Sequence, residues 1–152
     1  MRLSKASPAQ RYLLDVNVFV ALLDERHVHH SVVTAWFNMP GLQWCLCPFT
    51  EAGFLRYATR PETGNMTMSE ASRILALITE APGYRYQPVT DDWHTLCRPL
   101  FPRLFGPNQI TDAYLLGLAV REGLVLVTLD KAMLHLAGEH RSHVLLLTEQ
   151  AH

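Results

Sequence analysis

The stretch LVLVTLDKAM, residues 124–133, places an uninterrupted apolar run directly before an aspartate and the start of a helical segment. Continuous apolar runs are typical of strands that are buried on both faces of a parallel sheet. The segment YLLDVNVFVALL, residues 12–23, has the same order of a short apolar strand, an aspartate and a helix. This shared pattern predicts an α/β protein in which acidic residues directly follow buried strands.

Strands and helices alternate along the rest of the chain. Further strands are expected at residues 43–47, 84–89 and 143–148, the second on a weak pattern. Helices are expected at residues 27–39, 48–60, 68–79, 91–100, 109–123 and 130–138, with Ser31 as N-cap of the first. This alternation predicts right-handed crossovers and a parallel sheet with helices on both faces. We therefore expect a single-domain, three-layer α/β/α sandwich over residues 1–152, with its core at residues 11–149 and its strand order open.

Composition and charge narrow the class of protein. The 152 residues are 49% hydrophobic and 18% charged, and the formal net charge is −1. This charge offers no global attraction to nucleic acid, so any such binding surface must be local. The 3 cysteines are an odd number without zinc-site spacing, which argues against a disulfide framework and a zinc site. The sequence has neither a signal-peptide core nor a run of roughly 18 apolar residues. We expect a cytoplasmic protein without a membrane anchor.

Four acidic residues lie where such a sheet would bring them to one edge: Asp15, Glu51, Asp112 and Asp130. In parallel α/β sheets, ligands bind beyond the carboxyl ends of the strands. Two of the acids follow strands, and the other two are expected in the first turns of helices. Carboxylates gathered in this way repel one another unless a cation lies between them. Hard oxygen ligands select Mg²⁺ or Mn²⁺ rather than zinc, so the sequence predicts a magnesium or manganese site.

Each of these acids also has a structural interpretation. Asp15 and Asp130 are suited to cap the helices that follow them, and Glu51 complements a helix dipole. Taken singly, these three favour the structural interpretation. Asp112 differs, because the apolar sequence AYLLGLAV after it predicts a buried helix, and a carboxylate at its head needs a partner. The four acids together favour a metal site.

Four sequence blocks resemble the PIN-domain ribonucleases, and among them the VapC-type toxins of bacterial toxin–antitoxin pairs. The blocks are LLDVNVFVALL, FTEAGFLRYATRP, NQITDAYLLGLA and VTLDKAM, in family order and across nearly the whole chain. The resemblance implies a PIN-like α/β/α fold, a Mg²⁺- or Mn²⁺-dependent endoribonuclease, a homodimer, and a cognate antitoxin protein that blocks the cleft. In that pattern the acidic quartet is Asp15, Glu51, Asp112 and Asp130, with Asn17 and Thr128 in supporting positions.

The predicted reaction is metal-assisted hydrolysis of an RNA phosphodiester bond. Asp15, Asp112 and Glu51 are expected to hold the ion, while Asp130 orients the attacking water or a second ion. Because water rather than the ribose 2′-hydroxyl is the nucleophile, the products should carry a 5′-phosphate and a 3′-hydroxyl. The sequence does not indicate which RNA is cut.

Basic side chains near these acids have two interpretations each. Arg56 and Arg60 are four residues apart on a predicted helix, so they share a face and are candidates for RNA phosphate contacts. A solvated face or salt bridges to glutamates explains them equally well. The sequence HVHH, residues 27–30, is interpreted as packing at the entry to a helix, because no carboxylate stands beside it in the sequence.

Two other classes of protein remain compatible with parts of this pattern. A phosphoacceptor signalling domain also gathers acids, a threonine and a lysine at strand ends, but it needs paired acids at the first strand. Here Asp15 is followed by Val16 and Asn17. A catalytically silent PIN-like module that binds RNA or protein is the second alternative, and the complete acidic quartet argues against it.

Overall fold

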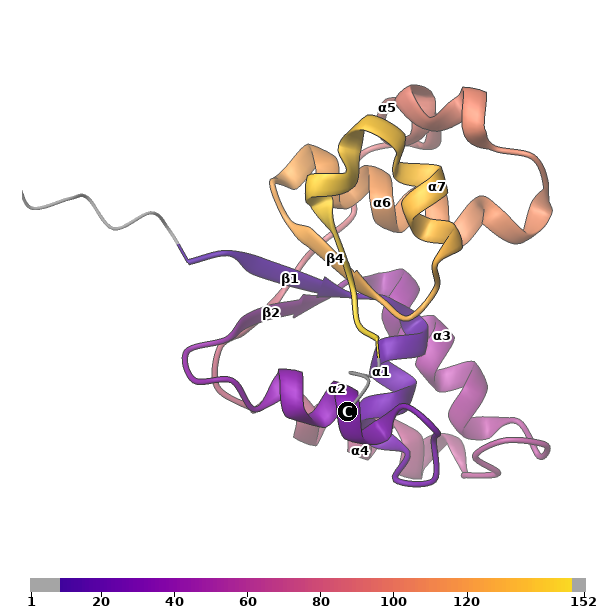
Figure 1. The fold of residues 1–152 in the computed structure, drawn as a ribbon. Helices are drawn as coiled ribbons and strands as arrows, with labels where there is room; N and C mark the ends of the chain where they lie inside the picture. Colours follow the sequence, from indigo (N-terminus) through magenta and orange to yellow (C-terminus); the bar gives the residue numbers. More distant parts are fainter. Residues whose placement is uncertain (1–8, 149–152) are drawn as a thin grey trace, which may run out of the picture.

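The computed structural model describes residues 9–148 and contains a five-stranded parallel sheet (Figure 1). The strand order is β3-β2-β1-β4-β5, with the first strand of the chain in the centre. Every pair of neighbouring strands is parallel. The strands are β1 Arg11–Leu14, β2 Gln43–Leu46, β3 Tyr84–Tyr86, β4 Val125–Thr128 and β5 Val144–Leu146.

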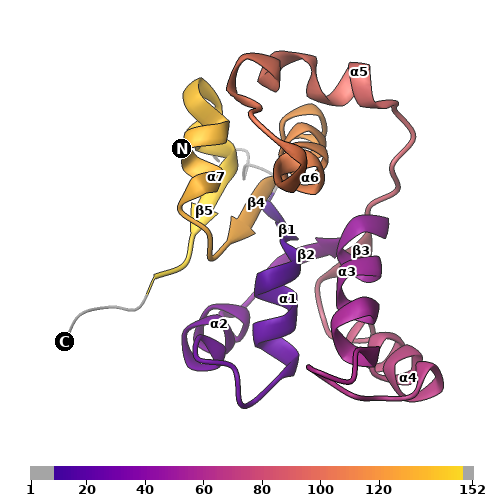
Figure 2. The ribbon, with the colours of Figure 1, turned by 90° about the vertical axis from the view of Figure 1, so that its right-hand side faces the viewer.

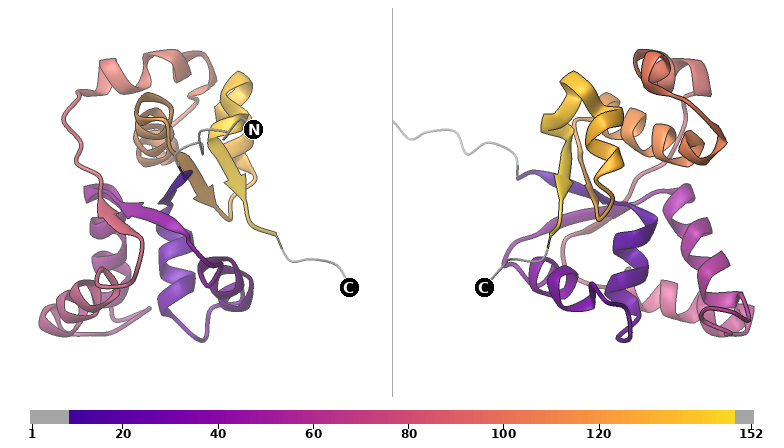
Figure 3. Two further views of the ribbon diagram at one scale, coloured as in Figure 1. Left: turned by 90° about the vertical axis from the view of Figure 1, so that its left-hand side faces the viewer. Right: turned by 45° about the vertical axis from the view of Figure 1, so that its right-hand side comes forward.

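Helices cover both faces of the sheet and form the two outer layers (Figure 2). One layer contains α1 Val16–Leu23, α2 His30–Phe37, α3 Pro48–Thr59 and α4 Met68–Ile78. The other contains α5 Trp93–Cys97, α6 Ile110–Glu122 and α7 Ala132–Ala137, with the 3₁₀ segments η1 Arg98–Arg103, η2 Pro107–Gln109 and η3 Gly138–His143. The separation of these layers is visible from further directions in Figure 3. The predicted three-layer α/β/α sandwich is confirmed.

Alternation of side chains along the strands divides the core into two parts. Leu13 and Leu126 belong to the cluster under α5, α6 and α7, whereas their successors Leu14 and Val127 belong to the cluster under α1, α3 and α4. All four side chains are fully buried. Successive residues of a strand point to opposite faces, so a strand covered by helices on both sides needs apolar residues at every position. The continuous apolar runs of the sequence have this physical cause.

Helix boundaries follow local signals in most cases. Pro48 opens α3 at its first position, where a missing N–H costs nothing. Thr67 and Glu70 form a reciprocal capping box at the start of α4. The prediction that Ser31 is the N-cap of α2 is wrong, because this helix begins at His30 and its N-cap is His29. The His29 side chain makes no capping hydrogen bond. The loop before α2 is tightened by other hydrogen bonds, described below, and these replace the cap.

One close approach between helices positions α1 against α3. A Cβ atom at Gly53 would lie 2.5 Å from the Val16 side chain, so only glycine permits this packing distance. Val16 is the first residue of α1 and directly follows Asp15. The approach therefore brings one face of α3 to the carboxyl edge of the sheet.

Two further expectations concern the membrane and the cysteines. Within residues 9–148, no helix combines the length and apolar character needed to cross a lipid bilayer. Cys45, Cys47 and Cys97 are free thiols and are buried. The first two lie in the same core cluster, as their alternation along the predicted strand indicated.

Candidate active site

A pocket of about 490 Å³ opens at the carboxyl ends of β1 and β4. We call it the acidic pocket because three carboxylates, Asp15, Asp112 and Asp130, lie in its wall. They come from the start of α1, the first turn of α6 and the residues after β4, in agreement with the sequence-based expectation. The other polar residues in its wall are Asn17, His27, Arg56, Tyr57 and Arg60.

Asp15 is the most buried of the three acids, with 5% of its surface exposed. Its Oδ1 accepts a hydrogen bond of 2.7 Å from the backbone N–H of Val16, and its Oδ2 accepts one of 2.7 Å from the hydroxyl of Thr128. The same hydroxyl oxygen accepts the backbone N–H of Asp130 at 3.1 Å. The structural interpretation of Asp15 thus applies, and this helix cap also forms part of the pocket wall, while its role as a metal ligand stays a prediction.

Asn17 and Thr128, the two predicted supporting residues, both join α1 to the end of β4. The Oδ1 atom of Asn17 accepts the backbone N–H of Leu129 at 3.3 Å. Thr128 is fully buried and contacts Asp15 and Asp130 through one hydroxyl. These bonds hold the loop after β4 against the first turn of α1, so that Asp130 stays beside Asp15.

The electrostatics of the three acids are unfavourable in the absence of a cation. Burial raises the pKa of Asp15, although its bonds to Thr128 and Val16 oppose this, and the charge of Asp130 raises it further. Burial also raises the pKa of Asp112 to about 6, with repulsion from Asp15 and Asp130 in the same direction. A bound cation would remove these costs, because it interacts favourably with every ionised carboxylate.

Glu51, the fourth predicted acid, is not among the residues that line the acidic pocket. It lies in the first turn of α3, where burial raises the pKa of its carboxyl. The pocket-facing residues of this helix are Gly53, Arg56, Tyr57 and Arg60, and Glu51 precedes Gly53 by two residues, roughly 200° around the helix. Burial raises the pKa values of Tyr84 and Tyr86 of β3, and the charge of Glu51 raises them further. The assignment of Glu51 to a metal site stays a prediction.

Arg56 and Arg60 both line the acidic pocket and are exposed to solvent. Among residues 9–148, neither guanidinium forms an ion pair with a carboxylate. The salt bridges to glutamates that the sequence left open are therefore not formed in this part of the chain. Both side chains keep their hydrogen-bond donors available beside the three carboxylates.

His27 was interpreted from the sequence as packing at a helix entry, with no carboxylate beside it. The structure corrects this interpretation, because His27 lies in the wall of the acidic pocket with three carboxylates. The chain returns to the pocket after α1 through a turn in which the backbone N–H of His27 bonds the carbonyl of Asp24 at 3.0 Å. No local sequence signal encodes that return, since it depends on how α1 packs on the sheet.

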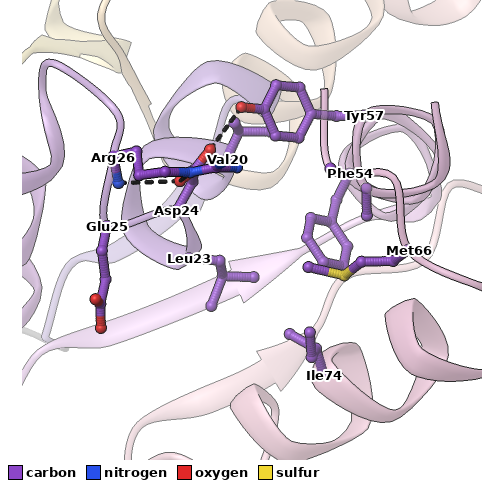
Figure 4. Close-up of a pocket in the computed structure, with 11 residues that line it drawn as sticks. Val20, Leu23, Asp24, Glu25, Arg26, Phe54, Tyr57, Met66 and Ile74 are labelled. Carbon is purple, nitrogen blue, oxygen red and sulfur yellow. Dashed lines mark hydrogen bonds and ion pairs between the residues drawn. The ribbon is translucent and has the colours of Figure 1, made fainter. Parts of the chain in front are cut away.

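A second pocket, of about 280 Å³ and drawn in Figure 4, shares Val20 and Tyr57 with the first. We call it the apolar pocket, since its walls include the side chains of Leu23, Phe54, Met66 and Ile74. Tyr57 lies in the walls of both pockets and donates a hydrogen bond of 2.7 Å to Asp24, drawn in Figure 4. This tyrosine separates the polar site from an apolar one. It was not singled out from the sequence, where nothing marks it apart from its neighbours.

The donor atoms of the acidic pocket suit a hard divalent cation, because they are carboxylate oxygens. Within residues 9–148, no three His, Cys, Asp or Glu side chains already lie within ligating distance of one point. The carboxylates of Asp15 and Asp130 are already engaged in other hydrogen bonds. Asp15 accepts bonds from Val16 and Thr128, and Asp130 accepts the N–H of Ala132 at 2.9 Å.

The family model described as PIN domain matches residues 12–139. The chain is 39% identical over 140 residues to Ribonuclease VapC38 of Mycobacterium tuberculosis, covering 90% of this chain and 97% of the relative. It is 35% identical over 141 residues to Ribonuclease VapC44 of the same species, covering 88% and 97%.

A solved structure shares the fold. The 2.2 Å resolution structure of VapBC-1 from nontypeable Haemophilus influenzae superposes with a TM-score of 0.57 and 17% sequence identity. The superposition covers 86% of this chain and 94% of that one. At this identity, the similarity supports the arrangement of sheet and helices.

Asp112→Asn removes a charge that the fold accommodates poorly. Because the pKa of Asp112 is raised from 3.8 to about 6, ionisation lowers the free energy of unfolding as the pH rises through this window. The shift corresponds to about 3 kcal/mol for a fully buried group, and screening of this half-buried carboxylate leaves about 1 kcal/mol. We expect the metal-free variant to exceed the wild type by that amount in urea unfolding at about pH 7.5. The gain should vanish near the ordinary pKa of 3.8.

Glu80→Gln provides the matched control, because Glu80 is exposed at the end of α4 and makes no side-chain bond within residues 9–148. Its stability should equal that of the wild type at both pH values. If Asp112→Asn were less stable than the wild type at about pH 7.5, Asp112 would be a satisfied structural residue, and the repulsion described above would be contradicted.

Proposed function

The chain belongs to the PIN domain family, and we propose that it is a divalent-metal-dependent endoribonuclease, the toxin of a VapBC-type toxin–antitoxin pair. The ribonuclease names of its relatives supply the reaction class. The observation that carries the proposal for this chain is the convergence of Asp15, Asp112 and Asp130 on one pocket from three separate segments. Three carboxylates in one pocket lower the stability of the fold when no cation is bound. A site that binds a cation explains this arrangement.

The proposed division of labour follows from burial and hydrogen bonding. Asp15 is held by Val16 and Thr128, so it is the fixed ligand, and Asp112 faces it from α6. Asp130 is exposed and can orient the attacking water. A divalent cation bound by these carboxylates would lower the pKa of water and neutralise charge on the phosphodiester. Arg56 and Arg60 would bind flanking phosphates, since their free guanidinium groups suit bidentate contacts.

Metal dependence can be tested by chelation. We expect the protein to cleave 5′-labelled RNA oligonucleotides of random sequence in Mg²⁺ or Mn²⁺, to lose all cleavage in EDTA, and to regain it when either ion is returned in excess. Asp112→Asn should reduce the cleavage rate by at least about a hundredfold, because it removes a charged ligand. Products with 5′-phosphate and 3′-hydroxyl ends, identified by mass spectrometry, are expected from hydrolysis by water.

Cleavage that survives chelation would overturn the metal mechanism and indicate attack by the ribose 2′-hydroxyl. An RNA-binding protein with no cleavage under any condition would instead be the catalytically silent module. Glu51→Gln, measured beside Asp112→Asn, decides whether the fourth acid acts at the site. A loss as large as that of Asp112→Asn would assign Glu51 to the ion, and near wild-type activity would remove it.

We further propose that an antitoxin segment spans both pockets and inhibits by competition. The apolar pocket accepts hydrophobic side chains, and the acidic pocket accepts an arginine that pairs with Asp15 or Asp112. Val20 and Tyr57 lie in both walls, so one continuous peptide can occupy both sites. An arginine in that position occupies the same carboxylates as the metal ion.

The competition makes antitoxin affinity depend on metal concentration. We expect the dissociation constant of the complex to rise as Mg²⁺ or Mn²⁺ is increased at constant ionic strength, as measured by fluorescence anisotropy. The antitoxin to be tested is a small protein encoded beside this chain. Asp112→Asn should weaken both the affinity and its metal dependence. Binding that is indifferent to metal would leave simple coverage of the pocket as the inhibitory mechanism.

The protein itself is proposed to be a homodimer. Large apolar side chains are exposed on the helical layer of α1 to α4 and its loops, where Val28 is 76% exposed and Met68 and Leu77 are each 59% exposed. Light scattering should give about twice the chain mass of 17.2 kDa. A mass of one chain at all workable concentrations would contradict the homodimer.

A further inference from the structure

His27 lies in the wall of the acidic pocket but has no role in holding an ion in the mechanism above. It sits in the connection between α1 and α2, and backbone bonds of 3.0 Å hold it on both sides. Its N–H donates to the carbonyl of Asp24, and its carbonyl accepts the N–H of His30. The residue is therefore positioned by the backbone and does not depend on a partner in the pocket.

The protonation pattern of the His27 ring follows from a third hydrogen bond. The backbone N–H of His29 donates to Nδ1 of His27 at 3.1 Å. A nitrogen that accepts a bond carries no proton, so the ring proton of His27 is on Nε2. Within residues 9–148, Nε2 makes no hydrogen bond and no ion pair with a carboxylate. His27 thus lies in the pocket wall and carries an N–H donor that no group within residues 9–148 accepts.

We propose that His27 donates a hydrogen bond from Nε2 to a phosphate oxygen of RNA bound in the acidic pocket, beside the contacts of Arg56 and Arg60. The inference rests on the proposed nuclease function and extends it to substrate binding. The carboxylates of the pocket are hydrogen-bond acceptors and cannot donate to a phosphate. The two arginines are donors, and His27 lies in the same pocket wall as they do. A single N–H donor suits this position, because it contacts a phosphate and leaves the carboxylates free for a cation.

Two substitutions separate this role from a purely structural one. In His27→Asn the side-chain oxygen replaces Nδ1, so the bond from His29 is kept and the Nε2 donor is lost. In His27→Gln the terminal amide reaches the Nε2 position as a donor, and the Nδ1 acceptor is lost. The proposal expects His27→Gln to keep most of the activity and His27→Asn to lose it. A structural role in the turn expects the reverse.

The measurement is the single-turnover cleavage rate of 5′-labelled random-sequence RNA oligonucleotides in Mg²⁺, with melting temperatures to verify folding. We expect His27→Asn to be slower than the wild type by roughly tenfold or more, as for loss of a hydrogen bond to a charged group. His27→Gln should fall within roughly threefold of the wild type on the same basis. His94→Asn is the matched control, because His94 is exposed on α5 and absent from the pocket wall.

Any result in which His27→Gln is not faster than His27→Asn overturns the proposal. That includes two variants that both match the wild type, and two that are equally impaired. An inactive wild type is a different outcome, because it refutes the nuclease function itself and the inference falls with it. Cleavage by the wild type and by His94→Asn therefore separates failure of this inference from failure of the function.

Discussion

A hydrogen bond of 2.7 Å joins the hydroxyl of Thr128 to the carboxylate of Asp15, two groups that are buried and 113 residues apart in sequence. It connects the ends of the two strands at the middle of the sheet, because β1 and β4 are neighbours. The same hydroxyl holds the backbone of Asp130, so one threonine sets the separation of two carboxylates. An unpaired carboxylate at this depth would be costly, and the geometry of the pocket follows from the need to satisfy it.

The pocket combines carboxylates that repel one another with guanidinium groups that donate hydrogen bonds. The two kinds of group lie on different elements. The carboxylates come from residues that follow β1 and β4 and from the head of α6, whereas the guanidinium groups come from α3. Contact between Gly53 and Val16 fixes the separation of these two sides, since a Cβ at residue 53 would push α3 away. An exposed arginine on this face can turn toward an anionic ligand without first breaking a salt bridge, so no ion pair is lost when the ligand binds.

Much of this arrangement was predictable because its signals are local. Apolar runs before Asp15 and Asp130 indicated strands with acids at their ends, and Pro48 marked a helix start. Three of the four predicted acids meet in one pocket, since parallel strands place their carboxyl ends at one edge. Strand order, the face of α3 that lines the pocket and the return of His27 to the pocket were not predictable. Each depends on packing between segments distant in sequence, which periodicity and capping residues do not encode.

The central position of β1 in the sheet has a consequence for synthesis of the protein. β1 leaves the ribosome before its neighbour β4, and 113 residues separate Asp15 from its partner Thr128. At about 5–20 residues per second, this interval lasts roughly 6–23 s. During that time Asp15 lacks its hydroxyl partner Thr128 and the carboxylate of Asp130, and Asp112 is added only late in the interval. The pocket of a nascent chain therefore stays incomplete until β4 has been synthesised, and translation that stops before β4 yields fragments unable to assemble one.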